Sequence, residues 1–509
     1  MNDLDLAGRD ARRAFVVQRL EQIAPFVLED PAASADLADR GPGPFLDEIA
    51  RAVQRRDSDD LTWLSLAAFL GVYPVPHLFS WFKRSLQLAQ PHEAMRVFMV
   101  AGTRASTGYH DLSTTLSVVT DAVVVDVDFC ARNSHATGIQ RVVRQTMKRW
   151  HRDHDLILTA WEHGSMALRR LGAGELERVI DFETSSARPW EQGRPDRVEF
   201  VVPFRSTVVI PEVPTVGICD PLAALAQFSG NTVSVIGYDA IPVVSADTVP
   251  PQESLRFVNY LTVVKHATRV AGISAAATQE FEGFTAALPA QGLEGPELST
   301  VSLPVESPPL TTEATPEKDD LPLVLSVGSH EPRKNHLATL FAAEMLWREG
   351  KKFRLRFIGG GNPWATQVFD VRIREAQRRG RPVEIVRGAS DDVLVSSYRN
   401  ARFFVFASTH EGYGLPVAEA LALGLPTITS DRGSLAEIAA DGGCLTVDPY
   451  DDDQLLAAMR ELLDSDERLA ELAAQARSRP KRTWNDYSAE LWEALVPSRA
   501  GRDEEDDDA

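Results

Sequence analysis

Two glutamates, Glu411 and Glu419, border a glycine–proline turn in the stretch THEGYGLPVAEALALGLPTITSD. The alanine- and leucine-rich run behind the turn predicts a helix that begins near Leu415. Gly412 and Gly414 allow the backbone to approach a ligand closely. The exposed amides and positive dipole end of such a helix suit a phosphate, and the carboxylates can accept hydrogen bonds from hydroxyl groups. Two glutamates alone more often only complement a helix dipole, so the neighbouring sequence must decide between these interpretations.

Two cations follow a strand-like run in the second half of the chain. The stretch SVGSHEPRKNH contributes Arg333 and Lys334 in a protein whose formal net charge is −20. Charge-assisted hydrogen bonds to phosphate are about twice as strong as neutral ones, so this turn suits a diphosphate, with a solvated basic turn as the alternative. In the first half, Gly138 of NSHATGIQRV lies between a predicted strand and its helix, where a bare backbone could face the same phosphates.

The elements that must position these residues alternate along the chain. From residue 121 onward, strand-like runs such as DAVVVDVDF, LILTAW and TVSVIG are separated by helix-like runs, which is typical of a parallel α/β sheet. A segment rich in proline, threonine and charge follows residue 305, and the same alternation then restarts with LPLVLSVGS, FRLRFIGGG and ARFFVFAS. Residues 1–115 show helical periodicity instead. Ligands of open α/β sheets bind beyond the carboxyl ends of the strands, which is where the motifs lie.

Composition excludes several classes of protein. The 509 residues are 44% hydrophobic and 25% charged, as in an ordinary soluble globular chain. The acidic net charge argues against nonspecific binding to nucleic acid. Three cysteines, Cys130, Cys219 and Cys444, lie far apart without a CxxC spacing, so we expect no disulfide framework or zinc site and a reducing cytoplasm. Residues 61–82 are apolar but interrupted by prolines, which predicts two buried or interfacial helices.

Taken together, these stretches resemble the retaining, nucleotide-sugar-dependent glycosyltransferases of the GT-B type, a large family that includes bacterial mannosyl- and glucosyltransferases. The resemblance extends over residues 121–495, and the glutamate pair has the family's EX7E spacing. It implies an α/β fold class with two Rossmann-like doubly wound domains that face a cleft. The expected parts are a helical extension (1–115), an N-terminal Rossmann-like acceptor domain (120–305), a linker (306–320), a C-terminal Rossmann-like nucleotide-sugar-binding domain (321–480), a helix that crosses back to the first domain (481–499) and an acidic disordered tail (500–509).

The resemblance also implies roles for individual residues. Lys334 and Arg333 would hold the donor diphosphate, and Glu419 would accept a hydrogen bond from the ribose. Asp239 would lie at the reacting face of the sugar. The transferred sugar would be held by Glu411 and by the amides around the turn, which are those of Gly412, Tyr413, Gly414 and Leu415. Further donor contacts would come from Gly138, Gly328 and Ser329.

This chain departs from the family pattern at two positions. Many members have arginine where Ser329 stands, which would shift more of the phosphate contact to Arg333 and Lys334. Members often have histidine where Tyr238 precedes Asp239, which leaves the catalytic role of Asp239 open.

Metal binding is an alternative use of some of these side chains. The sequence DVD would place Asp126 and Asp128 on one face of a strand, as in the metal-binding Asp-x-Asp motif of other transferases. The motif lies inside an apolar run, however, and His330, His336 and His410 lack the spacing of a helical metal pair. We therefore expect a plain hydrogen-bonding role for the histidines and no metal ion or other cofactor.

The activity implied by the resemblance is transfer of a sugar, with retention, from a nucleoside-diphosphate sugar to an acceptor hydroxyl in glycan or surface polysaccharide synthesis. The acceptor would be a glycan or a lipid-linked sugar, in the cytoplasm or at the inner face of the membrane, and no nucleic acid would bind. Residues 1–115 are the candidate contact for a membrane face or a second copy of the chain. The alternatives are a nucleotide-sugar epimerase or phosphorylase of the same fold, or a non-catalytic scaffold.

Overall fold

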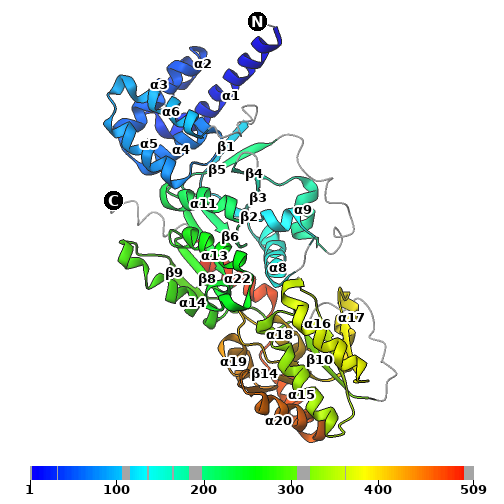
Figure 1. The fold of residues 1–509 in the computed structure, drawn as a ribbon. Helices are drawn as coiled ribbons and strands as arrows, with labels where there is room; N and C mark the ends of the chain where they lie inside the picture. Colours follow the sequence, from blue (N-terminus) through cyan, green and yellow to red (C-terminus); the bar gives the residue numbers. More distant parts are fainter. Residues whose placement is uncertain are drawn as a thin grey trace.

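The protein is elongated, with a helical region at one end and an α/β unit at the other (Figure 1). The computed structural model describes residues 3–30, 32–105, 115–134, 137–162, 166–182, 198–306, 321–361 and 363–497. These residues form a nine-stranded sheet in the middle of the molecule and a six-stranded sheet beyond it, which confirms the prediction of two α/β units behind a helical extension.

The N-terminal region is helical, as predicted. Prolines lie in the first turn of α3 and α5, where their missing N–H needs no partner, and Gly71 ends α4 in a left-handed conformation. Residues 61–82 comprise most of α4, the connection over residues 71–75 and the first half of α5, which agrees with the two predicted helices. The elements are α1 (Asp3–Val27), α2 (Ala33–Asp39), α3 (Pro42–Arg56), α4 (Asp59–Leu70), α5 (Pro76–Leu88), η1 (Pro91–Glu93) and α6 (Ala94–Ala105).

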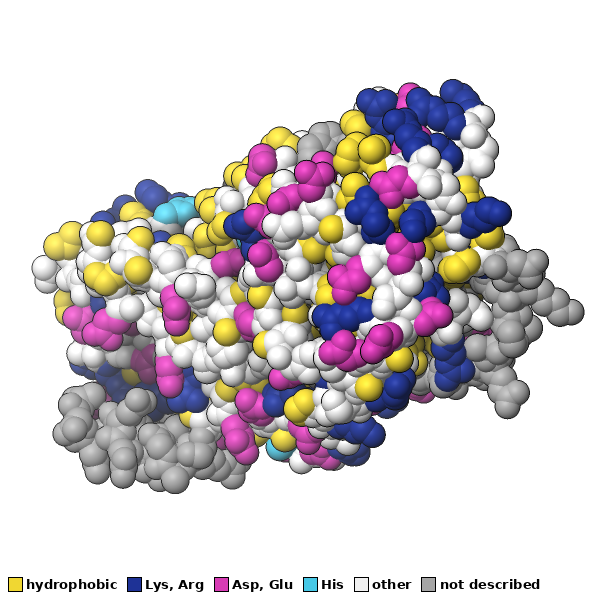
Figure 2. Space-filling view, turned by 90° about the horizontal axis from the view of Figure 1, so that it is seen from below, with side chains coloured by type: hydrophobic (Ala, Val, Ile, Leu, Met, Phe, Trp, Pro, Cys, Tyr) yellow, Lys and Arg dark blue, Asp and Glu magenta, His cyan; other side chains and the backbone are white. Residues whose placement is uncertain are grey.

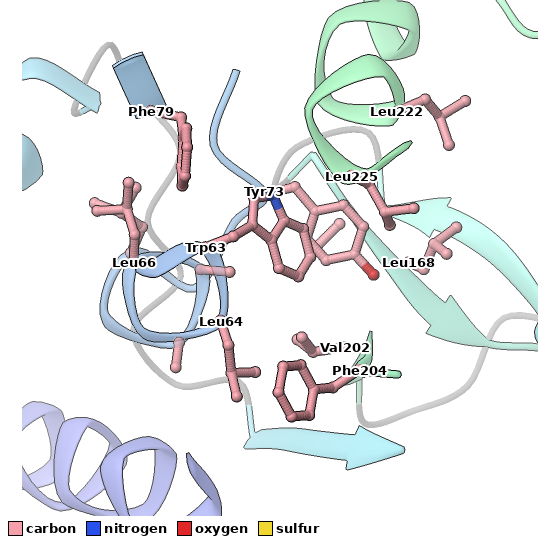
Figure 3. Close-up of a cluster of buried hydrophobic side chains, with 14 of the residues drawn as sticks. Trp63, Leu64, Leu66, Tyr73, Phe79, Leu168, Val202, Phe204, Leu222 and Leu225 are labelled. Atoms are coloured by element: carbon pink, nitrogen blue, oxygen red, sulfur yellow. The ribbon is translucent and has the colours of Figure 1, made fainter. Parts of the chain in front are cut away.

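The helical region shares one hydrophobic core with the nine-stranded sheet. Figure 3 shows Trp63 and Tyr73 beside residues of the sheet unit, among them Leu168 and Val202. The ring of Phe79 stacks on Phe228 of α11 (Val216–Phe228), with centroids 4.1 Å apart. The Tyr73 hydroxyl donates a hydrogen bond to the carbonyl oxygen of Val201 at 2.5 Å. Trp63 and Phe79 are only 0% and 1% exposed, so these aromatic side chains are core residues and not a contact surface.

The nine-stranded sheet has the order β1-β5-β4-β3-β2-β6-β7-β8-β9. It is parallel except for two antiparallel pairs, β3 with β4 and β4 with β5. The sheet also begins earlier than expected, because β1 precedes the first predicted strand and pairs with β5. Its strands are β1 (Thr115–Val119), β2 (Val123–Asp126), β3 (Ile157–Glu162), β4 (Ala167–Arg170), β5 (Glu199–Pro203), β6 (Thr207–Ile210), β7 (Thr232–Gly237), β8 (Arg269–Gly272) and β9 (Glu297–Thr300).

Helices connect these strands, as the alternating pattern predicts. They are α7 (Asp128–Arg132), α8 (Gly138–Asp153), α9 (Ala173–Ile180), α11 (Val216–Phe228), α12 (Ile241–Val244), η3 (Ala246–Thr248), α13 (Pro251–Val264), α14 (Ala275–Thr285) and η4 (Leu288–Gln291).

The six-stranded sheet is wholly parallel, in the order β12-β11-β10-β13-β14-β15. Its central strand β10 is buried along its whole length, which explains the uninterrupted apolar run that predicted it. The strands are β10 (Leu323–Val327), β11 (Arg354–Ile358), β12 (Val383–Val386), β13 (Ala401–Phe406), β14 (Thr427–Ser430) and β15 (Cys444–Val447). The helices are η5 (Pro332–Lys334), α15 (His336–Arg348), α16 (Pro363–Arg378), α17 (Asp391–Asn400), α18 (Leu415–Ala422), α19 (Gly433–Ala440), α20 (Asp452–Asp464) and α21 (Asp466–Ser478).

The last helix of the described chain, α22 (Trp484–Leu495), packs on the nine-stranded unit although it follows the six-stranded one in sequence (Figure 1). Trp150 Nε1 donates to the carbonyl oxygen of Ser488 at 2.8 Å, and Ser234 Oγ donates to that of Leu495 at 2.6 Å. The ring of Trp492 stacks on His154 with centroids 3.6 Å apart. The helix therefore ties the end of the chain to the first sheet.

The prediction that one strand runs through the whole DVD motif is wrong at the C-terminal end of that strand. Strand β2 stops at Asp126, and Asp128 opens α7 because the backbone turns at Val127. Both carboxylates accept hydrogen bonds from Trp161, Asp126 from the indole N–H at 2.7 Å and Asp128 from the backbone N–H at 2.9 Å. These aspartates are therefore held by protein donors and do not lie on one face of a strand.

The described residues also bear on three other kinds of feature, namely a metal site, a disulfide and a membrane-spanning helix. Within the described part of the chain, no group of three or more His, Cys, Asp or Glu side chains is placed to hold a metal ion. Cys130, Cys219 and Cys444 are free. None of the described helices combines the length and apolar character needed to cross a bilayer. Figure 2 shows acidic and basic side chains interspersed over most of the face seen from below, with Lys and Arg gathered at its upper right.

Candidate functional site

The turn before α18 has the conformation that its glycines suggest. Helix α18 begins at Leu415, as predicted, with a proline in its first turn. Gly414 has φ +114, and a Cβ atom there would lie 2.5 Å from Leu435 Cδ2. The backbone angle strongly disfavours a side chain at this position, and the Leu435 side chain would have to shift to make room for one. The first amides of α18 therefore emerge from a tightly packed turn that follows Glu411.

Arg333, Lys334 and Glu411 form one charged cluster at this turn. Lys334 Nζ lies 2.6 Å from Glu411 Oε1, and Arg333 Nη1 lies 3.0 Å from Glu411 Oε2. The side chains of Lys334 and Glu411 are 9% and 8% exposed. The short helix η5, which follows the turn after β10, carries both cations to the carboxylate. The residues predicted for the diphosphate and for the sugar are thus in direct contact.

Glu411 is held in its ionised form. Burial alone would raise the pKa of this carboxyl, but the charges of Lys334 and Arg333, and the hydrogen bond from Lys334, lower it to about 2. The same carboxylate charge raises the pKa of the Arg333 guanidinium against the opposing effect of burial. The cluster therefore presents two cations and a permanent hydrogen-bond acceptor.

Asp239 meets this cluster from the other sheet, where it follows the carboxyl end of β7. A Cβ atom on Gly412 would overlap the carbonyl oxygen of Tyr238 and lie 2.9 Å from Asp239 Oδ2. Burial raises the pKa of Asp239 to about 6, while Arg333 opposes this shift. Ser274 Oγ donates to the carbonyl oxygen of Gly412 at 2.6 Å. Gly412 therefore lets the two sheet units approach each other beside two carboxylates.

Glu419 is also bound across the two units. It forms an ion pair with Arg141 of α8 and accepts a hydrogen bond from the Tyr398 hydroxyl at 3.2 Å. Burial raises the pKa of Glu419, and Arg141 opposes that shift. At the start of α8, a Cβ atom on Gly138 would lie 3.5 Å from Leu415 Cδ1. The first-unit glycine predicted to face the donor thus lies against the start of α18.

Three other residues that were predicted to contact the donor, Tyr413, Gly328 and Ser329, lie outside the charged cluster. The hydroxyl of Tyr413 donates to the carbonyl oxygen of Leu303 at 2.7 Å, so its side chain serves packing between the units. Gly328, at φ +150, and the partly exposed Ser329 form the turn after β10. A Cβ atom on Gly328 would lie 3.8 Å from both Lys334 Cδ and His336 Nε2. This turn therefore borders the lysine of the charged cluster.

Sequence reasoning missed the partners that cross between the units. Arg141 lies within the stretch NSHATGIQRV, but it pairs with Glu419, which is 278 positions away. No local sequence pattern indicates this pairing. Glu280 of α14 carries no motif either, and it binds His410 Nε2. His410 Nδ1 lies 2.7 Å from Ser245 Oγ, which agrees with the plain hydrogen-bonding role expected for this histidine.

The family comparison identifies the second sheet unit. Residues 310–479 match the model of the family described as glycosyl transferases group 1. The second sheet unit is therefore similar to the glycosyl transferases group 1. The matched residues contain the whole cluster of Arg333, Lys334 and Glu411, together with Glu419.

Curated relatives of the chain include bacterial mannosyltransferases. The chain is 26% identical over 340 residues to the serotype-specific mannosyltransferase WbdA of Escherichia coli. The aligned region covers 63% of this chain and 40% of WbdA. The chain is also 33% identical over 142 residues to the O-antigen chain mannosyltransferase B of Escherichia coli, covering 28% of this chain and 37% of that one. The chain thus spans about two fifths of the length of WbdA.

Solved structures support the GT-B fold of the chain. Anabaena Alr3699/HepE, solved in complex with UDP and glucose, matches with a TM-score of 0.50 and 12% identity, over 74% of this chain and 100% of that one. The N-terminal domain of Candida albicans trehalose-6-phosphate phosphatase matches with a TM-score of 0.52 and 12% identity, over 74% and 97% of the two chains. At such identities the likeness concerns the fold alone.

Proposed function

We propose that this protein is a glycosyltransferase that moves a sugar, with retention of configuration, from a nucleoside-diphosphate sugar to an acceptor hydroxyl. The observation that carries the proposal is the buried cluster of Arg333, Lys334 and Glu411 beside the first turn of α18. This arrangement offers cations and helix amides to a diphosphate and a carboxylate to sugar hydroxyls. The named activities of the two Escherichia coli relatives favour mannose as the first sugar to test and a glycan or lipid-linked sugar as acceptor.

The main catalytic contribution is electrostatic. As the glycosidic bond breaks through an oxocarbenium-like transition state, negative charge grows on the departing diphosphate. Lys334, Arg333 and the amides of α18 are fixed before the reaction begins, so they stabilise that charge without reorganising. Each such donor contributes about 3 to 4 kcal/mol if its removal costs 10² to 10³ in rate. These cations neutralise the diphosphate in our proposal, and no metal ion is required.

Asp239 supports the reacting face of the sugar. Its carboxylate lies beside the Gly412 turn and becomes ionised above a pKa of about 6. A negative charge there favours the positive charge that develops on the sugar ring. The acceptor attacks from the face that the diphosphate leaves, and the leaving phosphate takes the acceptor proton.

The proposal is tested by nucleoside diphosphate release. The purified full chain is incubated with GDP-mannose, UDP-glucose or ADP-glucose and with a panel of mannosides and glucosides as acceptors. We expect release with one donor class, reduced 10² to 10³-fold in kcat in Lys334→Ala and in Glu411→Ala. Lys351→Ala is the matched control, since Lys351 pairs with Asp464 on the surface of the same unit. Unchanged release in both site variants would overturn the assignment of the site.

A further inference from the structure

One side chain of the first sheet unit contacts the loops of both candidate catalytic carboxylates. Glu280 of α14 accepts a hydrogen bond through Oε2 from the backbone N–H of Ala240, the residue after Asp239. Through Oε1 it binds Nε2 of His410, the residue before Glu411. The two contacts use different oxygens, so one carboxylate holds both loops at once.

The histidine in this arrangement is fixed on several sides. Its Nδ1 lies 2.7 Å from Ser245 Oγ of the first unit, and its carbonyl oxygen accepts a hydrogen bond from Arg333 Nη1 at 3.0 Å. The side chains of His410 and Glu280 are 17% and 14% exposed. A hydrogen-bonded ion pair shielded from water in this way is stronger than a surface pair. His410 therefore links the donor cluster of the second unit to the first unit.

We propose that Glu280 and His410 are positioning residues, which set Asp239 and Glu411 against the donor from opposite sides of the cleft. The inference rests on the function proposed above and adds residues to which no donor contact has been assigned. Glu280 fixes the backbone of Asp239 through Ala240 and the backbone of Glu411 through His410. A misplacement of about 1 Å at a reacting centre can cost about 10²-fold in rate, so loss of this link should act on kcat.

The ionisation of His410 gives the link a pH dependence. The charged groups that face it are Glu280 from α14, Asp239 from the loop after β7 and Arg333 from η5, with Glu411 next in sequence. Burial lowers the pKa of His410, but the hydrogen bond and charge of Glu280 outweigh burial and raise it above its ordinary value, with Arg333 opposing. The imidazolium is therefore present below this raised pKa, and the link weakens as pH rises through it.

The experiment compares Glu280→Gln, Glu280→Ala and His410→Gln with the wild type. The matched control is Glu282→Gln on the exposed face of the same helix. Release of nucleoside diphosphate gives kcat and KM across pH, and thermal shift gives the affinity for the donor. We expect kcat to fall about 10- to 100-fold in the Glu280 variants, while donor affinity changes less than about threefold. His410→Gln should lose the alkaline limb of the wild-type kcat profile, because glutamine donates to Glu280 without titrating.

Two results would overturn the inference while leaving the proposed function intact. One is an active wild type whose Glu280 and His410 variants keep both kcat and the alkaline limb. The other is a loss of kcat that follows a loss of melting temperature in every variant, including the isosteric Glu280→Gln. A wild type that releases no nucleoside diphosphate from any donor would instead contradict the proposed function itself.

Discussion

At the scale of single residues, Glu411 and its two cations form a site whose charges depend on one another. Glu411 stays ionised because Lys334 and Arg333 surround it, and removing one partner of a buried pair leaves the other charge uncompensated. The charge of Arg333 also acts on Asp239: burial raises the pKa of this carboxyl, and Arg333 lowers it in part. The titration of Asp239 is therefore coupled to the charge of Arg333 in the cluster.

This coupling predicts an acid limb in the pH profile of kcat/KM. If ionised Asp239 supports the reaction, kcat/KM should fall about tenfold per pH unit below its pKa of about 6. Arg333→Gln removes a charge that lowers this pKa, so the limb should move to higher pH in addition to the loss of rate. The measurement is nucleoside diphosphate release from pH 4.5 to 8, with Arg348→Gln on the exposed face of α15 as control. A limb that stays in place in Arg333→Gln would contradict the coupling.

At the scale of elements, the glycine turn before α18 determines how closely the two units approach. Gly412 leaves no room for a side chain beside Tyr238 and Asp239. The contact involves backbone atoms, so the neighbours of an added methyl group cannot simply rotate away. The turn therefore combines two tasks, presentation of the α18 amides and contact with the first unit.

Gly412→Ala should separate these tasks. We expect kcat/KM to fall about 10²-fold, because the added Cβ forces the loops of Asp239 and Glu411 apart. The melting temperature should fall as well, because Tyr238 and Tyr413 beside the overlap belong to one core that the two units share. Gly217→Ala is the control, because a Cβ atom there meets nothing within 4 Å. Full activity in Gly412→Ala would show that this close approach is not needed.

Local sequence signals predicted most of the elements that carry the site. The buried run of β10, the start of α18 and the helix from Gly138 lie where periodicity and turn chemistry placed them. The antiparallel strand β4 and the edge strand β1 were not foreseen, because short strands in mixed sheets lack a distinctive pattern. The pairing of Arg141 with Glu419 and of Glu280 with His410 could not be predicted either. Such pairs join segments more than a hundred residues apart and arise only when the two units meet.

At the scale of the whole molecule, the helical extension, the first sheet unit and α22 form one continuous body. The extension shares its core with the sheet, and α22 returns to that sheet from the second unit. The two sheet units meet through Arg141 and Glu419, through Ser274 and Gly412, and through Glu437, which accepts the backbone N–H of Ala276 at 2.6 Å. In the proposed function, these contacts between the units would keep water from the donor.

The shared core makes a prediction about stability. Trp63→Ala should lower the free energy of unfolding by about 3 to 5 kcal/mol, because Trp63 is wholly buried between the extension and the sheet (Figure 3). Leu88→Ala, at a side chain 85% exposed on the neighbouring α5, should change it little. Denaturant unfolding followed by circular dichroism is the measurement. A separate early transition of the extension in the wild type would contradict a shared core.

Donor binding tests the central claim most directly. The melting temperature of the full chain is measured with saturating GDP-, UDP- and ADP-sugars, for the wild type and for Lys334→Ala. A ligand at 100 times its dissociation constant stabilises the folded state by about 2.7 kcal/mol, so one donor class should raise the wild-type melting temperature by a few degrees and leave Lys334→Ala nearly unchanged. No shift with any nucleotide sugar, or an equal shift in both proteins, would contradict the assignment of this site to the donor.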